Sequence, residues 1–328
     1  MKCITKFIHF LFKDYRIILL YTYIMPEVCE IVMTSQYLMT KLKNRYITDI
    51  NILSGRYTHE NIVGKNLINK YAPLKIINVN SKGKFMWFEL LNEKDNKYIY
   101  ILNTFGLSGS WLFKDNPSNR IKFSIENKDK TKTYVLYFND PRNFGTIKIT
   151  DNIIDLNTKI NKLSVDLLKT EFSDDEFLDW VNNFKSKDKE IIKILMTQEV
   201  NKGIGSGLGN YLAPEILYHA KISPFRTISS LNNNEIINLA QSIRYILKLC
   251  YTNNKIGYME HFKNFIEKHK LGIKSGKYPQ YHKKVHINDN IEFQFSVYQK
   301  KKDPFGNNVV IDNIIPQRST YWVPSVQK

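Results

Sequence analysis

A glycine-dense segment, GIGSGLGN at residues 203–210, is the first candidate for chemistry in this sequence. It departs from the dinucleotide-binding pattern G-x-G-x-x-G, because Leu208 or Asn210 stands where the third glycine is required. It also lacks the Lys-Ser/Thr pair of a P-loop. A glycine turn that runs into a helix can still bring backbone N–H groups up to a phosphate. The alternative is a tight turn between helices that binds no ligand.

The charge of the chain favours an anionic partner. Its 328 residues carry a formal net charge of +17, and 43% of them are hydrophobic, enough for well-packed cores. An excess of Lys and Arg is expected of a protein that binds a polyphosphate, because neutralising phosphates releases counterions. A lysine-rich solvated surface is the alternative. Nucleic acid is therefore the favoured partner class.

Cysteine usage limits the location and the metal chemistry. Cys3, Cys29 and Cys250 lie far apart and form no CxxC pair. This spacing excludes a disulfide framework and argues against a cysteine-ligated zinc. We expect a reducing, intracellular location, wherever DNA is present.

Residues 1–24 are apolar but match no targeting signal. Lys13, Asp14 and Arg16 interrupt the apolar run, and no small-residue cleavage site follows. A membrane span needs about 20 mostly uncharged residues. We therefore interpret residues 1–24 as an addition to the folded protein, and we expect no membrane association.

The periodicity of the remaining chain changes twice. Behind Pro26, apolar residues recur at helical spacing, and proline suits a helix start. Short alternating segments then predict strands at 75–80, 85–91, 98–102, 120–126, 132–138 and 145–149. Helical spacing predicts helices at 174–184, 188–197, 210–220 and 233–252, with Asp174, Asp175, Asn233 and Asn234 as cap-type starts. At the C-terminus, FQFSVYQ (293–299) and VVIDNII (309–315) flank a turn-rich segment and predict a hairpin, followed by RSTYWVP.

Five segments are informative because of their order and spacing along the chain: MPEVCEI (25–31), SKGKF (81–85), FGLSGSW (105–111) with DPRNFG (140–145), GIGSGLGN, and QRSTYWVPSVQ (317–327). In order and spacing they resemble the formamidopyrimidine-DNA glycosylase/endonuclease VIII family, from Met25 to the C-terminus. The resemblance implies an α+β multidomain fold: an N-terminal helix with an antiparallel β-sandwich or barrel, a helix–two-turns–helix domain, and a C-terminal zincless-finger β-hairpin. The expected boundaries are 1–24 for the leader, 25–155 for the catalytic domain, 156–272 for the DNA-binding domain, and 273–328 for the end of the lesion loop and the finger.

The family carries Pro and Glu directly after the initiator Met, and Pro26 and Glu27 match them. The resemblance implies that the Pro26 nitrogen attacks C1′ of a damaged nucleotide and becomes a Schiff base. Glu27 would be the general acid/base, and Glu30 a supporting carboxylate that orders the N-terminus. Val28-Cys29 departs from the usual Gly or Leu followed by Pro, so we expect altered packing there.

Pro26 inside a chain is a tertiary amide and cannot attack carbon. We expect translation to begin at Met25 with removal of that Met; proteolytic cleavage of the leader is the alternative, and an inactive DNA binder is a third. Removing residues 1–24, with four basic and one acidic residue, leaves a net charge of +14.

Further matches imply contacts to DNA. Lys84 resembles the lysine that approaches the lesion phosphate and assists the reaction, and Asn210 resembles the asparagine that binds the same backbone. Arg318 matches the arginine at the tip of the terminal hairpin, whose guanidinium can grip a phosphate in bidentate fashion.

No cysteine follows Cys250, so a four-cysteine zinc finger cannot form, and we expect no metal and no cofactor. Val323 and Gln327 lie near positions where zinc-binding relatives have cysteines. We expect the finger to be held by packing of Phe293, Phe295, Tyr298 and Trp322.

Leu107, Arg142 and Phe144 match the triad that fills the space left by an extruded nucleotide. Asn143 departs from the usual arginine, which would weaken an adjacent backbone contact. Residues 255–287 correspond to the variable lesion-capping loop.

We therefore expect a monomeric bifunctional DNA glycosylase/AP lyase of base excision repair, acting on damaged duplex or single-stranded DNA by β,δ-elimination. The alternatives are an AP lyase with little glycosylase activity, a non-catalytic DNA-binding protein if Pro26 is not freed, and an RNA-binding protein.

Overall fold

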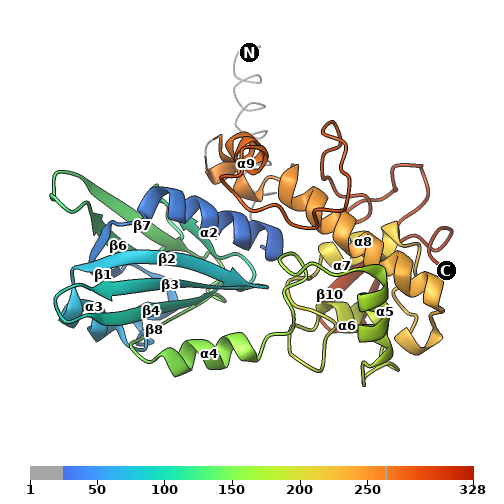
Figure 1. The fold of residues 1–328 in the computed structure, drawn as a ribbon, viewed down its shortest axis with the longest axis horizontal. Helices are drawn as coiled ribbons and strands as arrows, with labels where there is room; N and C mark the ends of the chain where they lie inside the picture. The colour runs from blue at the N-terminus through green and yellow to red at the C-terminus, as the bar shows by residue number, and fades with distance from the viewer. Residues whose placement is uncertain (1–24, 263) are drawn as a thin grey trace, which may run out of the picture. The chain divides into compact units, whose positions relative to one another are not determined.

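The computed structural model describes residues 25–328 apart from residue 263, so the predicted leader lies outside the described residues. The described chain forms two compact units. Unit 1 contains Pro26, Leu42–Asn78 and Trp87–Asp151, and unit 2 contains Glu27–Lys41, Val79–Met86 and Asn152–Lys328. Figure 1 shows the strands of unit 1 and the helices of unit 2. Among the described residues, no helix is long and apolar enough to cross a membrane.

The strands form an eight-stranded sheet in the order β5-β7-β6-β1-β2-β3-β4-β8. Their bounds are β1 Tyr46–Ile52, β2 Leu74–Lys82, β3 Phe85–Asn92, β4 Lys97–Thr104, β5 Ser110–Leu112, β6 Asn119–Glu126, β7 Thr133–Asn139 and β8 Thr146–Thr150. The pairs β1–β2, β1–β6, β6–β7, β5–β7 and β4–β8 are antiparallel. The sequence NRIKFSIE of β6 buries every second residue, which is why it forms a strand with one face on the core.

An aromatic cluster fills the core of unit 1. The buried Trp111 ring lies 5.0 Å from Phe88, 5.6 Å from Phe123 and 5.2 Å from Phe138, measured between centroids. Its indole N–H donates to the Asn103 side-chain oxygen at 3.1 Å, so its one polar atom is satisfied.

All six predicted strands are confirmed, and β1 and β5 add two that the sequence pattern did not reveal. In β1 the pairing with β6 shifts between Ile47 and Asp49, which breaks the alternation of buried residues. The β5 strand has only three residues. The short helices η1 Gly55–Thr58 and α3 Lys65–Tyr71 complete unit 1.

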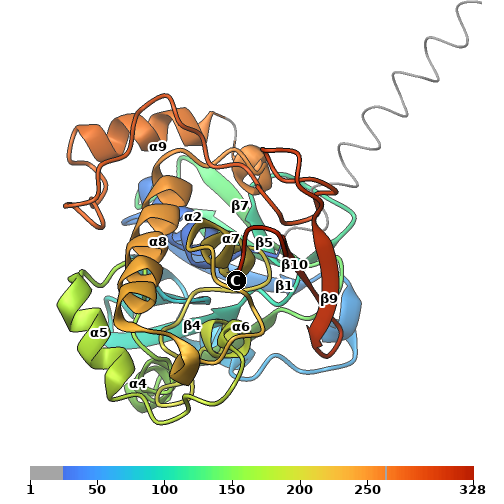
Figure 2. The ribbon, with the colours of Figure 1, turned by 90° about the vertical axis from the view of Figure 1, so that its right-hand side faces the viewer.

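Unit 2 is mainly helical. The helix α2 Val28–Leu42 begins behind Pro26 as predicted, with its last residue in unit 1. The predicted helices appear as α5 Asp174–Asn182, α6 Ile191–Met196, α7 Leu212–His219 and α8 Asn233–Thr252. The remaining helices are α4 Ile153–Asn161, η2 Ile228–Ser230, η3 Tyr258–His261 and α9 Phe265–Lys274. Figure 2 shows α9 lying across one end of α8.

The helices α5 and α8 begin at the predicted residues 174 and 233, but their capping residues lie one position before those predicted. Ser173 and Asn232 are the N-caps of α5 and α8, and each forms a reciprocal capping box. The side-chain oxygens of Ser173 and Asn232 accept the backbone N–H groups of Glu176 and Glu235. The carboxylates of these two glutamates in turn accept the backbone N–H groups of the two capping residues.

The predicted C-terminal hairpin pairs different strands from those expected. Residues 293–299 form no strand; β9 Val310–Ile315 pairs with β10 Arg318–Trp322. The buried Glu215 carboxylate of α7 accepts the backbone N–H groups of Ser296, Val297 and Tyr298 at 2.9–3.0 Å. Because a side chain satisfies these donors, this segment has no need of a partner strand.

Candidate functional site

The glycine turn packs against the first turn of α2. The Val28 N–H donates to the Gly207 oxygen at 3.1 Å. Gly207 has φ +117°, and a Cβ there would lie 2.6 Å from the Val28 Cβ. Only glycine allows both this backbone conformation and this close approach. The motif at 203–210 therefore positions the N-terminal end of α2.

The Glu27 carboxyl group is fully buried and meets the start of α7. Its oxygens accept the backbone N–H groups of Tyr211 at 3.0 Å and Leu212 at 3.3 Å. Lys84 Nζ lies 3.9 Å from Glu27 Oε1. Burial raises the pKa of Glu27 from 4.5 to about 7, while Lys84 and the two N–H groups pull it down. This carboxyl group can therefore hold or release a proton near neutral pH.

Lys84 lies at the tip of the β2–β3 hairpin, in the turn predicted for it. Gly209 leaves the space for its ammonium group, since a Cβ at Gly209 would lie 1.8 Å from Lys84 Nζ and 2.5 Å from Glu27 Oε1. Burial lowers the pKa of Lys84, the Glu27 carboxylate raises it, and the positive charge of Arg318 lowers it further. Glu27, Lys84, Gly209 and Arg318 thus belong to one electrostatic site.

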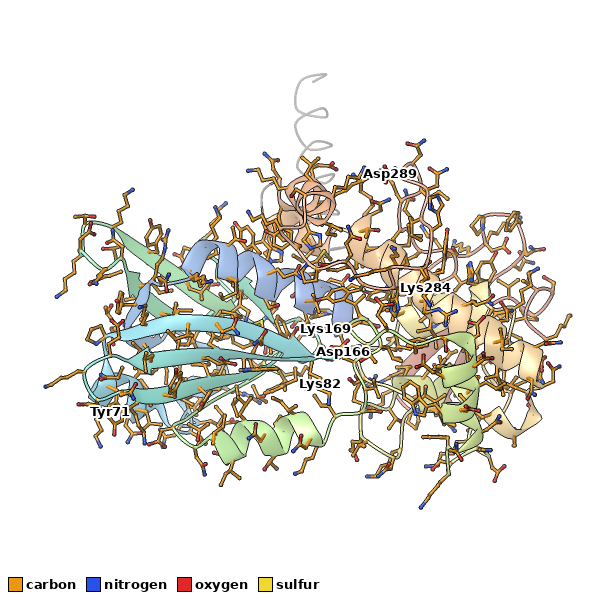
Figure 3. The ribbon with its side chains drawn as sticks, in the orientation of Figure 1. Tyr71, Lys82, Asp166, Lys169, Lys284 and Asp289 are labelled. Atoms are coloured by element: carbon orange, nitrogen blue, oxygen red, sulfur yellow. The ribbon has the colours of Figure 1, made fainter. Side chains whose placement is uncertain are left out.

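Asp166 anchors the hairpin that carries Lys84. One carboxylate oxygen accepts the Gly83 N–H at 2.9 Å, and the other accepts the N–H groups of Leu168 and Lys169 at 3.1 and 3.0 Å. Lys169 Nζ donates to the Ser81 oxygen at 2.5 Å on the same hairpin. Figure 3 shows Asp166 and Lys169 beside the end of this hairpin. The anchor helps to place Lys84 because it holds Ser81 and Gly83, which directly precede Lys84 in the hairpin.

Glu30 forms a second buried carboxylate site, one turn along α2. Its Oε2 accepts the Glu27 N–H at 3.0 Å and the Tyr211 hydroxyl at 2.5 Å, and its Oε1 accepts the Asn254 amide at 2.7 Å. Burial raises the pKa of Glu30, and these donors lower it. Glu30 holds the backbone directly behind Pro26, which is itself buried.

The predicted DNA contacts of unit 2 lie at accessible positions. The side chain of Asn210 is half-buried and hydrogen-bonded to the Tyr298 hydroxyl. Arg318 is exposed and follows the turn between β9 and β10, at the tip of the hairpin as predicted.

Aromatic packing around Tyr211 holds the segment before the hairpin. The Tyr211 ring lies 6.2 Å from Phe293, 5.3 Å from Phe295 and 6.2 Å from Tyr298. Trp322, expected in this cluster, instead contacts Phe225 and donates to Asp312.

At the positions compared with zinc-binding cysteines, the Val323 N–H donates to Gln327 Oε1 at 2.7 Å. The Gln327 amide in turn donates to the Ile222 oxygen at 2.9 Å. These bonds fasten the end of the chain to the segment after α7. Among the described residues, no group of three or more His, Cys, Asp and Glu side chains is arranged to hold a metal ion.

The predicted void-filling residues lie on two joined loops of unit 1. The Arg142 N–H donates to the Ser108 hydroxyl at 3.1 Å, and Ser108 donates to Asp140 at 2.8 Å. Arg142 and Phe144 are exposed, Phe144 by 58%, and Leu107 is half-buried. The structure thus presents a large apolar ring at the surface, beside an arginine.

Three residues of the site in unit 2 were not foreseen: Tyr211, Asn254 and Asp166. Tyr211 directly follows the glycine motif, which was an available signal. Asn254 and Asp166 carry no local signal, because each acts on a segment more than 80 residues away.

Comparisons with known proteins agree along most of the chain. The formamidopyrimidine-DNA glycosylase N-terminal domain family matches residues 25–147, the H2TH domain of the same glycosylases matches 163–260, and their C-terminal domain matches 283–328. The formamidopyrimidine-DNA glycosylase of Corynebacterium glutamicum (strain R) is 27% identical over 230 residues, covering 66% of this chain and 75% of the relative. That of Arabidopsis thaliana is 28% identical over 240 residues, covering 68% and 57%.

Solved structures share the fold. The MutM (Fpg) protein of Thermus thermophilus superposes with a TM-score of 0.65 at 20% identity, covering 92% of this chain and 98% of that one. The Lactococcus lactis Fpg in complex with DNA containing an abasic site gives a TM-score of 0.66 at 18% identity, covering 92% and 99%.

Proposed function

This chain belongs to the formamidopyrimidine-DNA glycosylase family, and we propose that it is a bifunctional DNA glycosylase and AP lyase of base excision repair. The observation that carries the proposal is the Glu27 carboxyl group, buried beside Lys84 and directly after Pro26, with a pKa raised to about 7. The names of the relatives point to DNA that carries formamidopyrimidine bases as a substrate.

In the proposed reaction, the neutral Pro26 nitrogen attacks C1′ of the damaged nucleotide, and the bond from C1′ to the base breaks. The base leaves with a proton, and the Pro26 nitrogen loses its own proton as the N–C1′ bond forms, so the two transfers balance. Glu27 donates its proton to the sugar ring oxygen, the C1′–O4′ bond opens, and a cationic iminium forms between Pro26 and C1′. A raised pKa suits this role because the carboxyl group must be protonated near neutral pH before it can donate.

The iminium then withdraws electrons from C2′. Loss of a C2′ proton breaks the bond from C3′ to oxygen, and loss of a C4′ proton breaks the bond from C5′ to oxygen, so both phosphates are released. Water finally hydrolyses the iminium and restores the amine. No cofactor is required, because the protein supplies both the nucleophile and the electron sink.

Two groups of residues would hold the DNA: one binds its phosphates, and the other fills the space that the extruded nucleotide leaves in the base stack. Lys84, Asn210 and Arg318 are proposed to bind phosphates flanking the lesion. Leu107, Arg142 and Phe144 are proposed to occupy the space left by the extruded nucleotide; the exposed Phe144 ring suits insertion into a base stack.

The proposal requires an amine at Pro26 that is free of any peptide bond to Met25. Protein produced from Met25, with that Met removed, should be trapped on damaged DNA by borohydride, which reduces the iminium to a stable adduct. Pro26→Gly should trap far less, while its primary amine keeps some activity. Protein that retains residues 1–24 is the matched control and should give no adduct.

A panel of substrates separates the rival functions. Adducts on abasic DNA alone would identify an AP lyase with little glycosylase activity. DNA binding without any adduct would identify a non-catalytic DNA-binding protein. Undiminished trapping by Pro26→Gly would contradict the assignment of Pro26 as the nucleophile.

A further inference from the structure

A cavity of about 250 Å³ lies in unit 2, lined by residues from the C-terminal end of α8, from α9 and from the loop that follows α9. Residues 261–282, which include α9, fall between the stretches matched by the H2TH and C-terminal domain families. Part of the wall of this cavity therefore comes from a segment that the family matches do not cover.

The cavity lies on the opposite face of α8 from the buried carboxylates. Cys250 points toward Glu30. Lys248 and Thr252, two residues before and two residues after Cys250 on α8, line the cavity. Two residues turn an α-helix by about 200°, so Cys250 and these two residues face opposite ways. The helix α8 thus separates the cavity from Glu27 and Glu30.

The charged lining is strongly basic. Lys248, Lys270, Lys274 and Lys283 line the cavity together with His286, and Asp289 is the single carboxylate among the lining residues. Lys274 pairs with Asp289 at 2.6 Å, on the loop beside α9 (Figure 3). Lys248, Lys270 and Lys283 form no ion pair with a carboxylate of this wall, while Asp289 also acts at longer range on Lys270 and His286.

Backbone contacts keep two of these lysines in place. Lys248 Nζ donates to the oxygens of His282 at 3.0 Å and Val285 at 2.7 Å, and Lys270 Nζ donates to the Asp289 oxygen at 2.9 Å. Each ammonium group has three protons, so each retains a donor. Outside the lining, Glu171 acts on Lys248, and its carboxylate accepts the Lys283 N–H at 3.3 Å.

Asn253 adds a second, independent sign of a ligand. Its side chain is 96% buried and lines the cavity, and its Nδ2 donates to the Ile291 oxygen at 2.6 Å. Its Oδ1 is buried and finds no donor in the part of the chain that the structure describes. Such an acceptor requires a partner, because a buried polar atom that is left unpaired destabilises the fold. Tyr281 and Ile273 give the same cavity an aromatic and an apolar wall.

We propose that this cavity binds a phosphate ester of nucleotide size. The lysines would hold the phosphate, Asn253 Oδ1 would accept an N–H or O–H of the sugar or base, and Tyr281 would contact the base. Two sources share this chemistry: a free mononucleotide, and a nucleotide of a DNA strand that passes over α8 and α9. The proposal stands independently of the proposed catalysis, because α8 lies between the two sites.

The test compares two lysines of α9. Lys270→Glu reverses a charge in the wall of the cavity, and Lys268→Glu makes the same change at an exposed position that does not line it. Calorimetric titration with a deoxynucleoside 5′-monophosphate, its nucleoside and inorganic phosphate measures the small-molecule site. Affinity for an undamaged single-stranded oligonucleotide, measured by fluorescence anisotropy, tests whether the cavity binds a nucleotide of a DNA strand. Melting temperatures of both variants that equal the melting temperature of the wild type exclude a folding defect.

A free nucleotide site predicts that the monophosphate binds, that the nucleoside does not, and that Lys270→Glu alone weakens binding about tenfold or more. A strand site predicts little binding of the monophosphate and a larger loss of oligonucleotide affinity in Lys270→Glu than in Lys268→Glu. The proposal is overturned if no small phosphate binds and both variants lose the same oligonucleotide affinity. Borohydride trapping, followed separately, reports on the catalytic site alone.

Discussion

Glu27→Gln exchanges a buried carboxyl group for an amide of nearly equal size, and so isolates the free energy of charging this side chain. The pKa of Glu27 is raised from 4.5 to about 7 in the folded protein. Each pKa unit is worth about 1.4 kcal/mol, so the full difference corresponds to about 3 kcal/mol. The side chain is 0% exposed, so solvent does not screen this effect.

The sign follows from proton binding. Between pH 4.5 and about 7 the folded protein holds the Glu27 proton more tightly than the unfolded chain does. The free energy of unfolding of the wild type should therefore fall as pH rises through this window, with no contribution below it and the full loss above it. The amide introduced by Glu27→Gln does not titrate. The wild type should thus lose about 3 kcal/mol relative to Glu27→Gln between pH 4.5 and pH 8.

Urea unfolding at several pH values, followed by circular dichroism, measures this difference. A constant offset of about 1–3 kcal/mol is expected in addition, because the new amide group would face the N–H of Tyr211 or Leu212. Glu267→Gln, at a side chain 68% exposed on α9, controls for the loss of one negative charge. A difference between wild type and Glu27→Gln that stays constant from pH 4.5 to 8 would refute the raised pKa, and with it the argument for Glu27 as an acid near neutral pH.

Three further substitutions test the site. Gly209→Ala should reduce borohydride trapping about tenfold or more, because the added Cβ would lie 1.8 Å from Lys84 Nζ; trapping at the wild-type level would show that this space is not needed. Asp166→Asn should lower kcat more than DNA affinity, because the Gly83 N–H loses its anionic acceptor and the Lys84 turn loosens; a change in KM alone would contradict a positioning role. Arg318→Ala should weaken DNA binding by about 1–3 kcal/mol, measured by anisotropy at fixed salt; lost activity with unchanged binding would point to another role.

Gly306→Ala is a useful control for the Gly209 experiment. Gly306 also lies in unit 2, but a Cβ there would meet nothing within 4 Å. Its φ of +89° strains any other residue, so the variant tests a glycine substitution that affects stability without entering the site. Its trapping should remain at the wild-type level.

Local patterns predicted much of the fold. The alternation in β6 and the helical spacing of α8 each span several residues, and each belongs to a segment that buries one face. The errors fall where a distant group replaces a local partner. Residues 293–299 looked like a strand, but the Glu215 carboxylate binds the backbone donors of Ser296, Val297 and Tyr298. No local pattern can indicate a partner about 80 residues away.

The order of short motifs in the sequence was enough to identify the family and to propose roles for Pro26 and Glu27, and the sequence itself shows that no cysteine follows Cys250. The pKa of Glu27 depends on the tertiary structure, which buries its carboxyl group and so raises the pKa. The fold also places Lys84 and two backbone N–H groups next to this carboxyl group, where they lower the pKa. The anchor at Asp166 and the basic cavity beside α8 also exist only in the folded chain. Sequence motifs specify chemical groups, whereas pKa values and binding sites depend on burial and on distances between segments that only folding brings together.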